Sequence, residues 1–197
     1  YISSLILIAP KIEGGLEIEM IGKDTSLPYI EMTIDLLKKI GVSATFQNNI
    51  ISISQKDKIN SIEITVEPDW SSASYFYSIV SLAEIGYALE LSNFKSYSIQ
   101  GDKSVSKIFE LFGVKTTFLD ESIRLEKIAK SEKIINLDLS ANPDLAQTIA
   151  VTCLALKISC KLIGLHTLKI KETDRIIALE NEIKKFNVFP MVTNDSI

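Results

Sequence analysis

The sequence has few of the residues that build disulfide frameworks and metal sites. Its 197 residues include two cysteines and one histidine. Cys153 and Cys160 match neither a disulfide framework nor a metal-binding spacing, and both lie in apolar segments, so we interpret them as packing residues of a reduced, cytoplasmic protein. His166 follows an apolar run and is interpreted as a structural residue rather than a ligand. We therefore expect no metal site and no cofactor.

Long apolar runs and an excess of one charge sign are also missing. No apolar run approaches the ~18 to 20 residues of a membrane span, and Ile2–Pro10 lacks the basic leader of a signal peptide. The formal net charge is −4 and the basic residues are dispersed, so no basic field is present to collect a polyanion. We expect no membrane segment and no nucleic-acid partner, and any anion must be bound by local groups.

Arginine is scarce, which makes one segment conspicuous. Only two of the 21 basic residues are arginine, Arg124 and Arg175. Arg175 ends the segment Lys169–Arg175 (KIKETDR), which places five charged residues in seven positions between a strand-like run, Leu162–Leu168, and a helix-like run, Ile176–Phe186. A guanidinium here indicates a need for a planar, permanently charged fork. The alternative interpretation is a solvated helix start with acidic residues placed against the helix dipole.

The spacing of this segment predicts a small charged site. If a helix begins near Glu172, the side chains of Lys171 and Glu172 share one region with the first free backbone N–H groups of that helix. Arg175 then lies one turn further on. Such a cluster can bind an anion and transfer a proton.

An internal repeat of about 72 residues is the most informative feature of the chain. With 46% hydrophobic and 23% charged residues, the sequence is typical of globular proteins and long enough for one large domain or two small ones. Gly or Asn just past a helix ends it in the left-handed conformation, and the β-branched run that follows predicts a strand. Three helix ends run in this way into a hairpin, at Leu36–Ile53, Ile108–Leu125 and Ile183–Ile197, with Gly41, Gly113 and Asn187 aligned.

The segments upstream of these hairpins also agree, and the consensus unit is β-α-β-α-β-β, an α/β (α+β) fold. Only the middle unit is expected to be complete, and it opens with a strand at Ser61–Val66. A linker near Lys58–Ser61 is expected to separate a partial domain, residues 1–60, from two units of another domain, residues 61–197. The chain is therefore predicted to be a fragment truncated at both ends. The expected helices are Ile2–Ala9, Ser71–Leu82 and Leu145–Leu156, and the strands that follow them are Leu16–Ile21, Ala88–Leu91 and Lys161–Ile163.

Several polar residues at helix starts have an ordinary structural explanation. Asn142 and Asp69 are each expected to cap a helix, and Asp144 is an acid in a first turn. Ser26 and Tyr29 mark another helix entry. If the repeats pack with a common orientation, these helix N-termini converge on a cleft, and several positive helix ends aimed at one cleft form an anion site.

These motifs resemble those of one enzyme family. The resemblance to 5-enolpyruvylshikimate-3-phosphate synthase (3-phosphoshikimate 1-carboxyvinyltransferase) covers essentially the whole chain. It implies a fold of two domains, each with three β-α-β-α-β-β units arranged as an inside-out α/β barrel, and helix ends that face an interdomain cleft. The motifs that carry it are Lys171-Glu172-Thr173-Asp174-Arg175, the PDLAQTIA run from Pro143 to Ala150, the DWSSASY run from Asp69 to Tyr75, and Gln100-Gly101-Asp102.

The resemblance also implies a reaction. The family transfers the enolpyruvyl group of phosphoenolpyruvate to the 5-hydroxyl of shikimate 3-phosphate and releases phosphate, a step of aromatic amino-acid biosynthesis in the shikimate pathway. It implies a cytoplasmic transferase that needs no cofactor and whose full-length form is a monomer. By this resemblance Asp144 is the catalytic base on the 5-hydroxyl, and Lys171 and Glu172 are catalytic residues that handle protons on phosphoenolpyruvate. Phosphoenolpyruvate is bound by Arg175. Shikimate 3-phosphate is bound by Ser26, Tyr29, Asp144, Thr167 and Lys171.

The sequence departs from the family pattern at two positions. Leu27 stands where the family usually has Lys or Arg, and Thr167 stands where many members have an Asn that contacts the shikimate phosphate. A Thr hydroxyl replaces only part of that hydrogen bonding. The isolated chain is expected to be inactive, because the family's other cationic ligands lie outside it.

Two alternative functions stay open. A UDP-N-acetylglucosamine enolpyruvyl transferase shares the fold and the donor, although its pattern lacks KETDR. A non-catalytic repeat module would instead bind a protein partner through an exposed apolar face.

Overall fold

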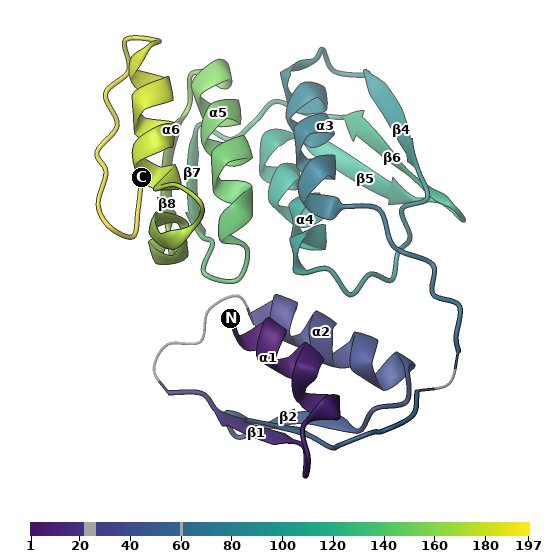
Figure 1. Cartoon of the computed structure of the whole chain (residues 1–197). Coiled ribbons are helices and arrows are strands. Elements are labelled where there is room, and N and C mark those ends of the chain that lie inside the picture. The colour runs from purple at the N-terminus through teal and green to yellow at the C-terminus, as the bar shows by residue number, and fades with distance from the viewer. Residues whose placement is uncertain (22–26, 60) are drawn as a thin grey trace. The chain divides into compact units, whose positions relative to one another are not determined.

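The computed structural model describes residues 1–21, 27–59 and 61–197 (Figure 1). The chain divides into two compact units. The first comprises Tyr1–Val66 with Ile99–Gly101, and the second comprises Glu67–Ser98 with Asp102–Ile197. Each unit has its own apolar core. The expected domain boundary between residues 60 and 61 stays a prediction.

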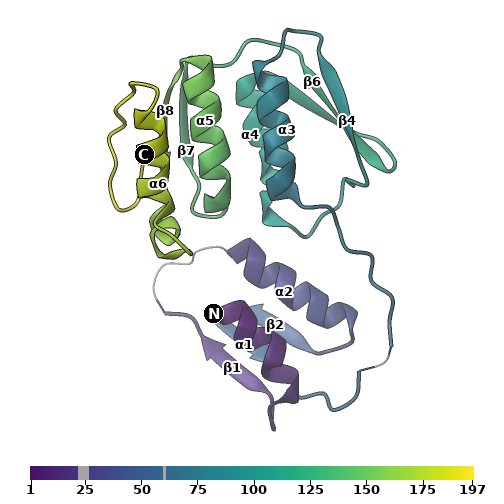
Figure 2. The same ribbon diagram turned by 45° about the horizontal axis from the view of Figure 1, so that its top comes forward.

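Two helices cover one face of a three-stranded sheet in the first unit (Figures 1 and 2). The strands are antiparallel in the order β1-β3-β2. Asn48 and Asn49, with φ of 51° and 62°, form the two-residue hairpin turn between β2 and β3. The elements are α1 (Ile2–Ile8), the 3₁₀ helix η1 (Ala9–Lys11), β1 (Leu16–Glu19), α2 (Leu27–Lys39), β2 (Ala44–Gln47) and β3 (Ile50–Ile53).

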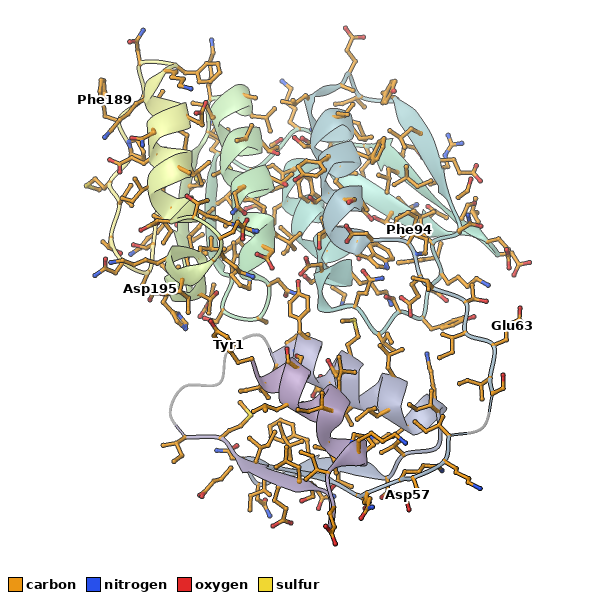
Figure 3. The ribbon with its side chains drawn as sticks, viewed as in Figure 1. Tyr1, Asp57, Glu63, Phe94, Phe189 and Asp195 are labelled. Atoms are coloured by element: carbon orange, nitrogen blue, oxygen red, sulfur yellow. The ribbon has the colours of Figure 1, made fainter. Side chains whose placement is uncertain are left out.

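The second unit begins with the same succession of elements. It contains α3 (Trp70–Leu82), β4 (Ala88–Ser92), η2 (Gly101–Ser104, of which Gly101 is assigned to the first unit), α4 (Val105–Ile108), η3 (Phe109–Phe112), β5 (Val114–Phe118) and β6 (Ser122–Lys127). Its antiparallel sheet has the order β4-β6-β5, which matches β1-β3-β2. Trp70, at the start of α3, contacts Phe94 edge to face with ring centroids 4.9 Å apart, and Figure 3 labels Phe94 below β4.

The remaining elements of the second unit form a parallel pair of strands and its helices. They are β7 (Ile134–Asp138), η4 (Pro143–Leu145), α5 (Ala146–Leu156), β8 (Ser159–Ile163), η5 (His166–Ile170) and α6 (Arg175–Lys184). Strands β7 and β8 are parallel and aligned from Ile134↔Ser159 to Asp138↔Ile163. Ile197 exchanges backbone hydrogen bonds of 2.8 and 3.0 Å with Leu162 of β8. The C-terminal segment therefore lies antiparallel to β8, as β3 lies against β1.

The residues that follow the helix in each of the three predicted helix–hairpin segments share one backbone conformation. Gly41, Gly113 and Asn187 have φ of 80°, 72° and 58°, all in the left-handed region. The prediction that these residues stop their helices is confirmed. The matching sheet orders also confirm the helix–strand–strand repeat in the first two segments.

Two expected strands are wrong. Ser61–Val66 belongs to neither a helix nor a strand in the described part of the chain, and all six of its residues are exposed. An alternating apolar pattern is not sufficient, since a strand also needs a neighbour for its backbone hydrogen bonds. The strand-like run Leu162–Leu168 ends early, because Gly164 has φ of 79° and turns the chain into η5.

Among the described residues, none of the helices is both long enough and apolar enough to span a bilayer.

Candidate active site

The charged segment lies in the loop that precedes helix α6. This helix begins at Arg175, and Asp174 is its N-cap. The Asp174 Oδ1 atom accepts hydrogen bonds from the backbone N–H groups of Ile176 and Ile177, both at 3.1 Å. The expected helix start near Glu172 is therefore wrong, because the Asp174 carboxylate provides the cap further along the chain. Two first-turn N–H groups are bound to the protein itself and are not free to hold an anion.

Asp144 joins this loop to the preceding one. It lies in η4, between β7 and α5. Its Oδ1 atom accepts a hydrogen bond of 2.9 Å from Arg175 Nη1, and its Oδ2 atom accepts one of 3.2 Å from Lys171 Nζ. The Asp144 side chain is 21% exposed, so this carboxylate holds two cations at a mostly covered position. Charge-assisted hydrogen bonds of this kind are stronger than neutral ones.

Glu172 occupies the other side of the Arg175 fork. Its Oε1 atom accepts hydrogen bonds from Arg175 Nε at 3.1 Å and Nη2 at 2.6 Å. A hydrogen bond from its own backbone N–H, and then the Arg175 guanidinium, lower the pKa of Glu172. The guanidinium therefore bridges two carboxylates with three of its five N–H donors, which the single ammonium group of lysine cannot reproduce in the same plane.

The parallel pairing of β7 and β8 explains why the two loops meet. Carboxyl ends of parallel strands lie at the same edge of a sheet, so the loop after β7, which carries Asp144, leaves beside the loop after β8, which leads to Lys171. Asp138, the last residue of β7, accepts hydrogen bonds from Ser140 N at 2.9 Å and Ser140 Oγ at 2.6 Å. A Cβ atom on Gly164 would lie 2.3 Å from Ser140 Oγ. Only glycine allows the loops to approach this closely.

The sequence predicted that Asp144 would lie near Lys171, Glu172 and Arg175, but the close approach of Gly164 to Ser140 and Asp138 was not anticipated. The available signal was a glycine directly after a strand, which often marks a close approach of two backbone segments. A strand that ends in Asp and is followed two residues later by Ser is a second signal, typical of an Asx turn.

The other predicted site residues lie elsewhere. Thr167 is in η5, and its Oγ1 atom is buried without a hydrogen-bond partner among the described residues. Tyr29 is in α2 of the first unit. Ser26 lies outside the described residues. The structure thus brings together four of the predicted site residues, namely Asp144, Lys171, Glu172 and Arg175.

His166 binds the C-terminal segment and not the charged cluster. Its Nδ1 atom lies 3.2 Å from Asp195 Oδ1, and its backbone N–H donates to the same oxygen at 3.0 Å. Figure 3 labels Asp195 beside η5. These contacts fix the loop that leads to Lys171.

The cluster is chemically suited to anions and protons. Two cations and two carboxylates balance one another, so an incoming anionic group can take over contacts with the cations while a carboxylate accepts a proton. Across the described ranges, no three or more His, Cys, Asp or Glu residues form a group that could hold a metal ion.

Comparison with known proteins gives a consistent picture. A family model described as EPSP synthase (3-phosphoshikimate 1-carboxyvinyltransferase) matches residues 1–197. The curated 3-phosphoshikimate 1-carboxyvinyltransferase of Bacteroides fragilis is 39% identical over 197 residues, which is 100% of this chain and 48% of the relative. That of Histophilus somni is 32% identical over 187 residues, 94% of this chain and 42% of the relative. The chain spans about half the length of the curated relatives it matches.

A solved structure shows the same fold. The EPSP synthase of Acinetobacter baumannii matches 96% of this chain with a TM-score of 0.66 and 20% sequence identity, and the match covers 43% of that chain. The mixed helix and sheet architecture agrees with the fold class expected from the repeat.

Proposed function

Because the chain belongs to the EPSP synthase (3-phosphoshikimate 1-carboxyvinyltransferase) family, we propose that it forms part of an enzyme that transfers the enolpyruvyl group of phosphoenolpyruvate to the 5-hydroxyl of shikimate 3-phosphate and releases phosphate. The observation that carries this proposal is the cluster in which Asp144 holds Lys171 and Arg175. Both substrates are anions, and the reaction needs cations to hold them and groups to move protons.

Each member of the cluster has a proposed role. Asp144 accepts the proton of the 5-hydroxyl as the oxygen attacks the enolpyruvyl carbon. Lys171 and Glu172 handle the protons at the methylene carbon and the leaving phosphate, and Lys171 also contacts shikimate 3-phosphate. Arg175 binds phosphoenolpyruvate through its fork, since planar bidentate recognition suits carboxylate and phosphate groups. Ser26, Tyr29 and Thr167 are proposed to bind shikimate 3-phosphate.

Glu172→Gln in the full-length protein tests the proposal, with Glu182→Gln as its matched control. Both glutamates form an i,i+3 ion pair, and their side chains are 68% and 64% exposed. Losing a preorganised contact to the transition state typically costs ~100- to 1,000-fold in rate. A phosphate-release assay should therefore show a loss of about 100-fold or more for Glu172→Gln and for Asp144→Asn, and none for Glu182→Gln.

Other outcomes would favour the alternative functions. No phosphate release by the wild-type full-length protein, together with unchanged binding of a protein partner by Asp144→Asn and Glu172→Gln, would support a non-catalytic module. Protection of the full-length protein from heat by UDP-N-acetylglucosamine, but not by shikimate 3-phosphate, would support the related transferase.

We also propose that residues 1–197 alone do not turn over substrate, although the full-length enzyme does. Relatives of the chain are about twice as long, and several electrostatic contacts to the transition state are expected to come from their other half. The whole protein is proposed to be a cytoplasmic monomer. Residues 1–60 and 61–197 are proposed to belong to different domains. Phosphate release above background by the isolated chain would show that its own residues suffice.

A further inference from the structure

A buried carboxylate lies outside the charged cluster. Asp102, in η2, is 2% exposed and forms no ion pair within the described residues. Its Oδ2 atom accepts a hydrogen bond of 2.5 Å from Ser71 Oγ, and its Oδ1 atom accepts one of 3.0 Å from Asn142 Nδ2. Burying a carboxylate without a cation costs free energy even when it is hydrogen-bonded. The position of its two donors indicates what this arrangement achieves.

The two donors begin different helical segments. Ser71 lies in the first turn of α3, and Asn142 is the N-cap residue of η4, two positions before Asp144. Asn142 occupies the N-cap position that the sequence predicted, but its side chain makes no capping hydrogen bond. Its amide is directed to Asp102 instead. Asp102 therefore ties the start of α3 to the loop that carries Asp144.

Two further hydrogen bonds continue this connection along the packed helices α3 and α5, which lie side by side in Figures 1 and 2. Ser74 Oγ lies 2.9 Å from Thr148 Oγ1, and Thr152 Oγ1 donates to Ser78 Oγ at 2.8 Å. Positions three or four apart share one face of a helix. The three polar contacts thus fix the register of α3 against α5, and the Asp102 contact is the one next to Asp144.

We propose that Asp102 is a positioning residue for Asp144. By holding the Asn142 amide, it fixes the backbone of residues 142–144 where the Asp144 carboxylate meets Lys171 and Arg175. This inference rests on the proposed function of the same site and deepens it. Without Asp102, the buried Asn142 amide loses its acceptor and the loop shifts. A displacement of about 1 Å at a reacting group costs up to ~100-fold in rate.

Asp102→Ala in the full-length enzyme tests the proposal. Because Asp144 acts in the chemical step, kcat should fall by about 10- to 100-fold, and KM for either substrate should change by a smaller factor than kcat. Asp102→Asn should restore kcat to within about fivefold of wild type, since its oxygen can accept from Asn142 and its amide can donate to the Ser71 hydroxyl. A merely structural role would not produce this split between kcat and KM together with rescue.

Thr152→Val is the matched control. It removes the polar contact furthest from Asp144 and should lower the melting temperature while leaving kcat unchanged. If Asp102→Ala does not fold, Asn142→Ala takes its place, because it removes the hydrogen bond through which Asp102 holds the loop. Unchanged kcat in whichever of these two variants is measured overturns the proposal.

An inactive wild-type enzyme would contradict the proposed function and not the inference. The crystal structure of Asp102→Ala, or of Asn142→Ala if the former does not fold, would then decide. A displaced Asp144 that no longer binds Arg175 supports the positioning role. An Asp144 that keeps its place and its hydrogen bond overturns it.

Discussion

Replacing Gly164 by alanine tests the close approach of the two loops that form the charged cluster. Gly164 has φ of 79°, and an added Cβ would lie 2.3 Å from Ser140 Oγ, 2.5 Å from Ser140 N and 2.6 Å from Asp138 Oδ1. The left-handed conformation costs a residue with a Cβ roughly 1–2 kcal/mol. Ser140 must also move, which breaks one or both of its hydrogen bonds to Asp138, each worth about 1 kcal/mol. We expect Gly164→Ala to lower the free energy of unfolding by about 2–4 kcal/mol.

Gly86→Ala separates the conformational cost from the steric one. Gly86 also has positive φ, 97°, but nothing lies within 4 Å of the position of an added Cβ. It belongs to the same unit as Gly164. Its replacement should therefore cost only the roughly 1–2 kcal/mol of the left-handed conformation.

Urea unfolding followed by the fluorescence of Trp70 measures both variants. Trp70 is the only tryptophan and is buried in the core of the second unit, so its signal reports the unfolding of that unit. With an m-value of about 2 kcal/mol/M, within the usual range for urea, the midpoint of Gly164→Ala should lie about 0.5–1 M below that of Gly86→Ala. Equal midpoints for the two variants would refute the argument that Ser140 and Asp138 require a glycine at position 164.

Two further predictions concern the pH dependence of stability. Partial burial raises the pKa of Asp69, but hydrogen bonds from Ser72 and from the first-turn backbone of α3 lower it by more, so the net pKa is lowered. Asp69→Ala should therefore cost about 1 kcal/mol of unfolding free energy at neutral pH. Urea titrations should show this difference shrinking as pH falls below 3.8 through the folded-state pKa. Burial lowers the pKa of Lys127, whose Nζ donates to Phe112 O at 2.6 Å. Because the folded state releases this proton more easily than the unfolded state, wild type should gain stability relative to Lys127→Met as pH rises from that lowered pKa towards 10.5. Ser131 Oγ still donates to Phe112 O in the variant, so an unchanged stability difference across this range, measured by the same titrations, would contradict a buried charged lysine.

Local signals made much of the fold predictable. The left-handed backbone conformation after a helix depends mainly on a glycine or asparagine at one position. Gly41, Gly113 and Asn187 could therefore be identified without knowledge of the residues that contact them in the fold. The spacing of the repeat then gave the order of the elements. Strand pairing is different, because it depends on a second segment. Ser61–Val66 has the pattern of a strand, but no strand of the described part of the chain pairs with it.

The candidate site divides in the same way. The dense charges of Lys171–Arg175 and the family resemblance identified the residues that meet Asp144, while their proposed roles stay predictions. Where a polar side chain has two possible hydrogen-bond partners, the sequence did not show which of them it binds. Asn142 was expected to cap its own helix but binds Asp102, and this choice depends on a residue 40 positions away in the sequence. The start of α6 was likewise expected near Glu172, but Asp174 caps the helix, which begins at Arg175.

The segment Ser61–Val66 has a consequence for the behaviour of the chain in solution. Its apolar side chains, Ile62, Ile64 and Val66, alternate along the segment and are exposed, and its backbone N–H and C=O groups belong to none of the sheets among the described residues. Glu63, labelled in Figure 3, is its only charged residue. Such a segment is a template on which another molecule can add a strand. We therefore expect the 197-residue chain to self-associate as its concentration rises, even at temperatures at which both units stay folded.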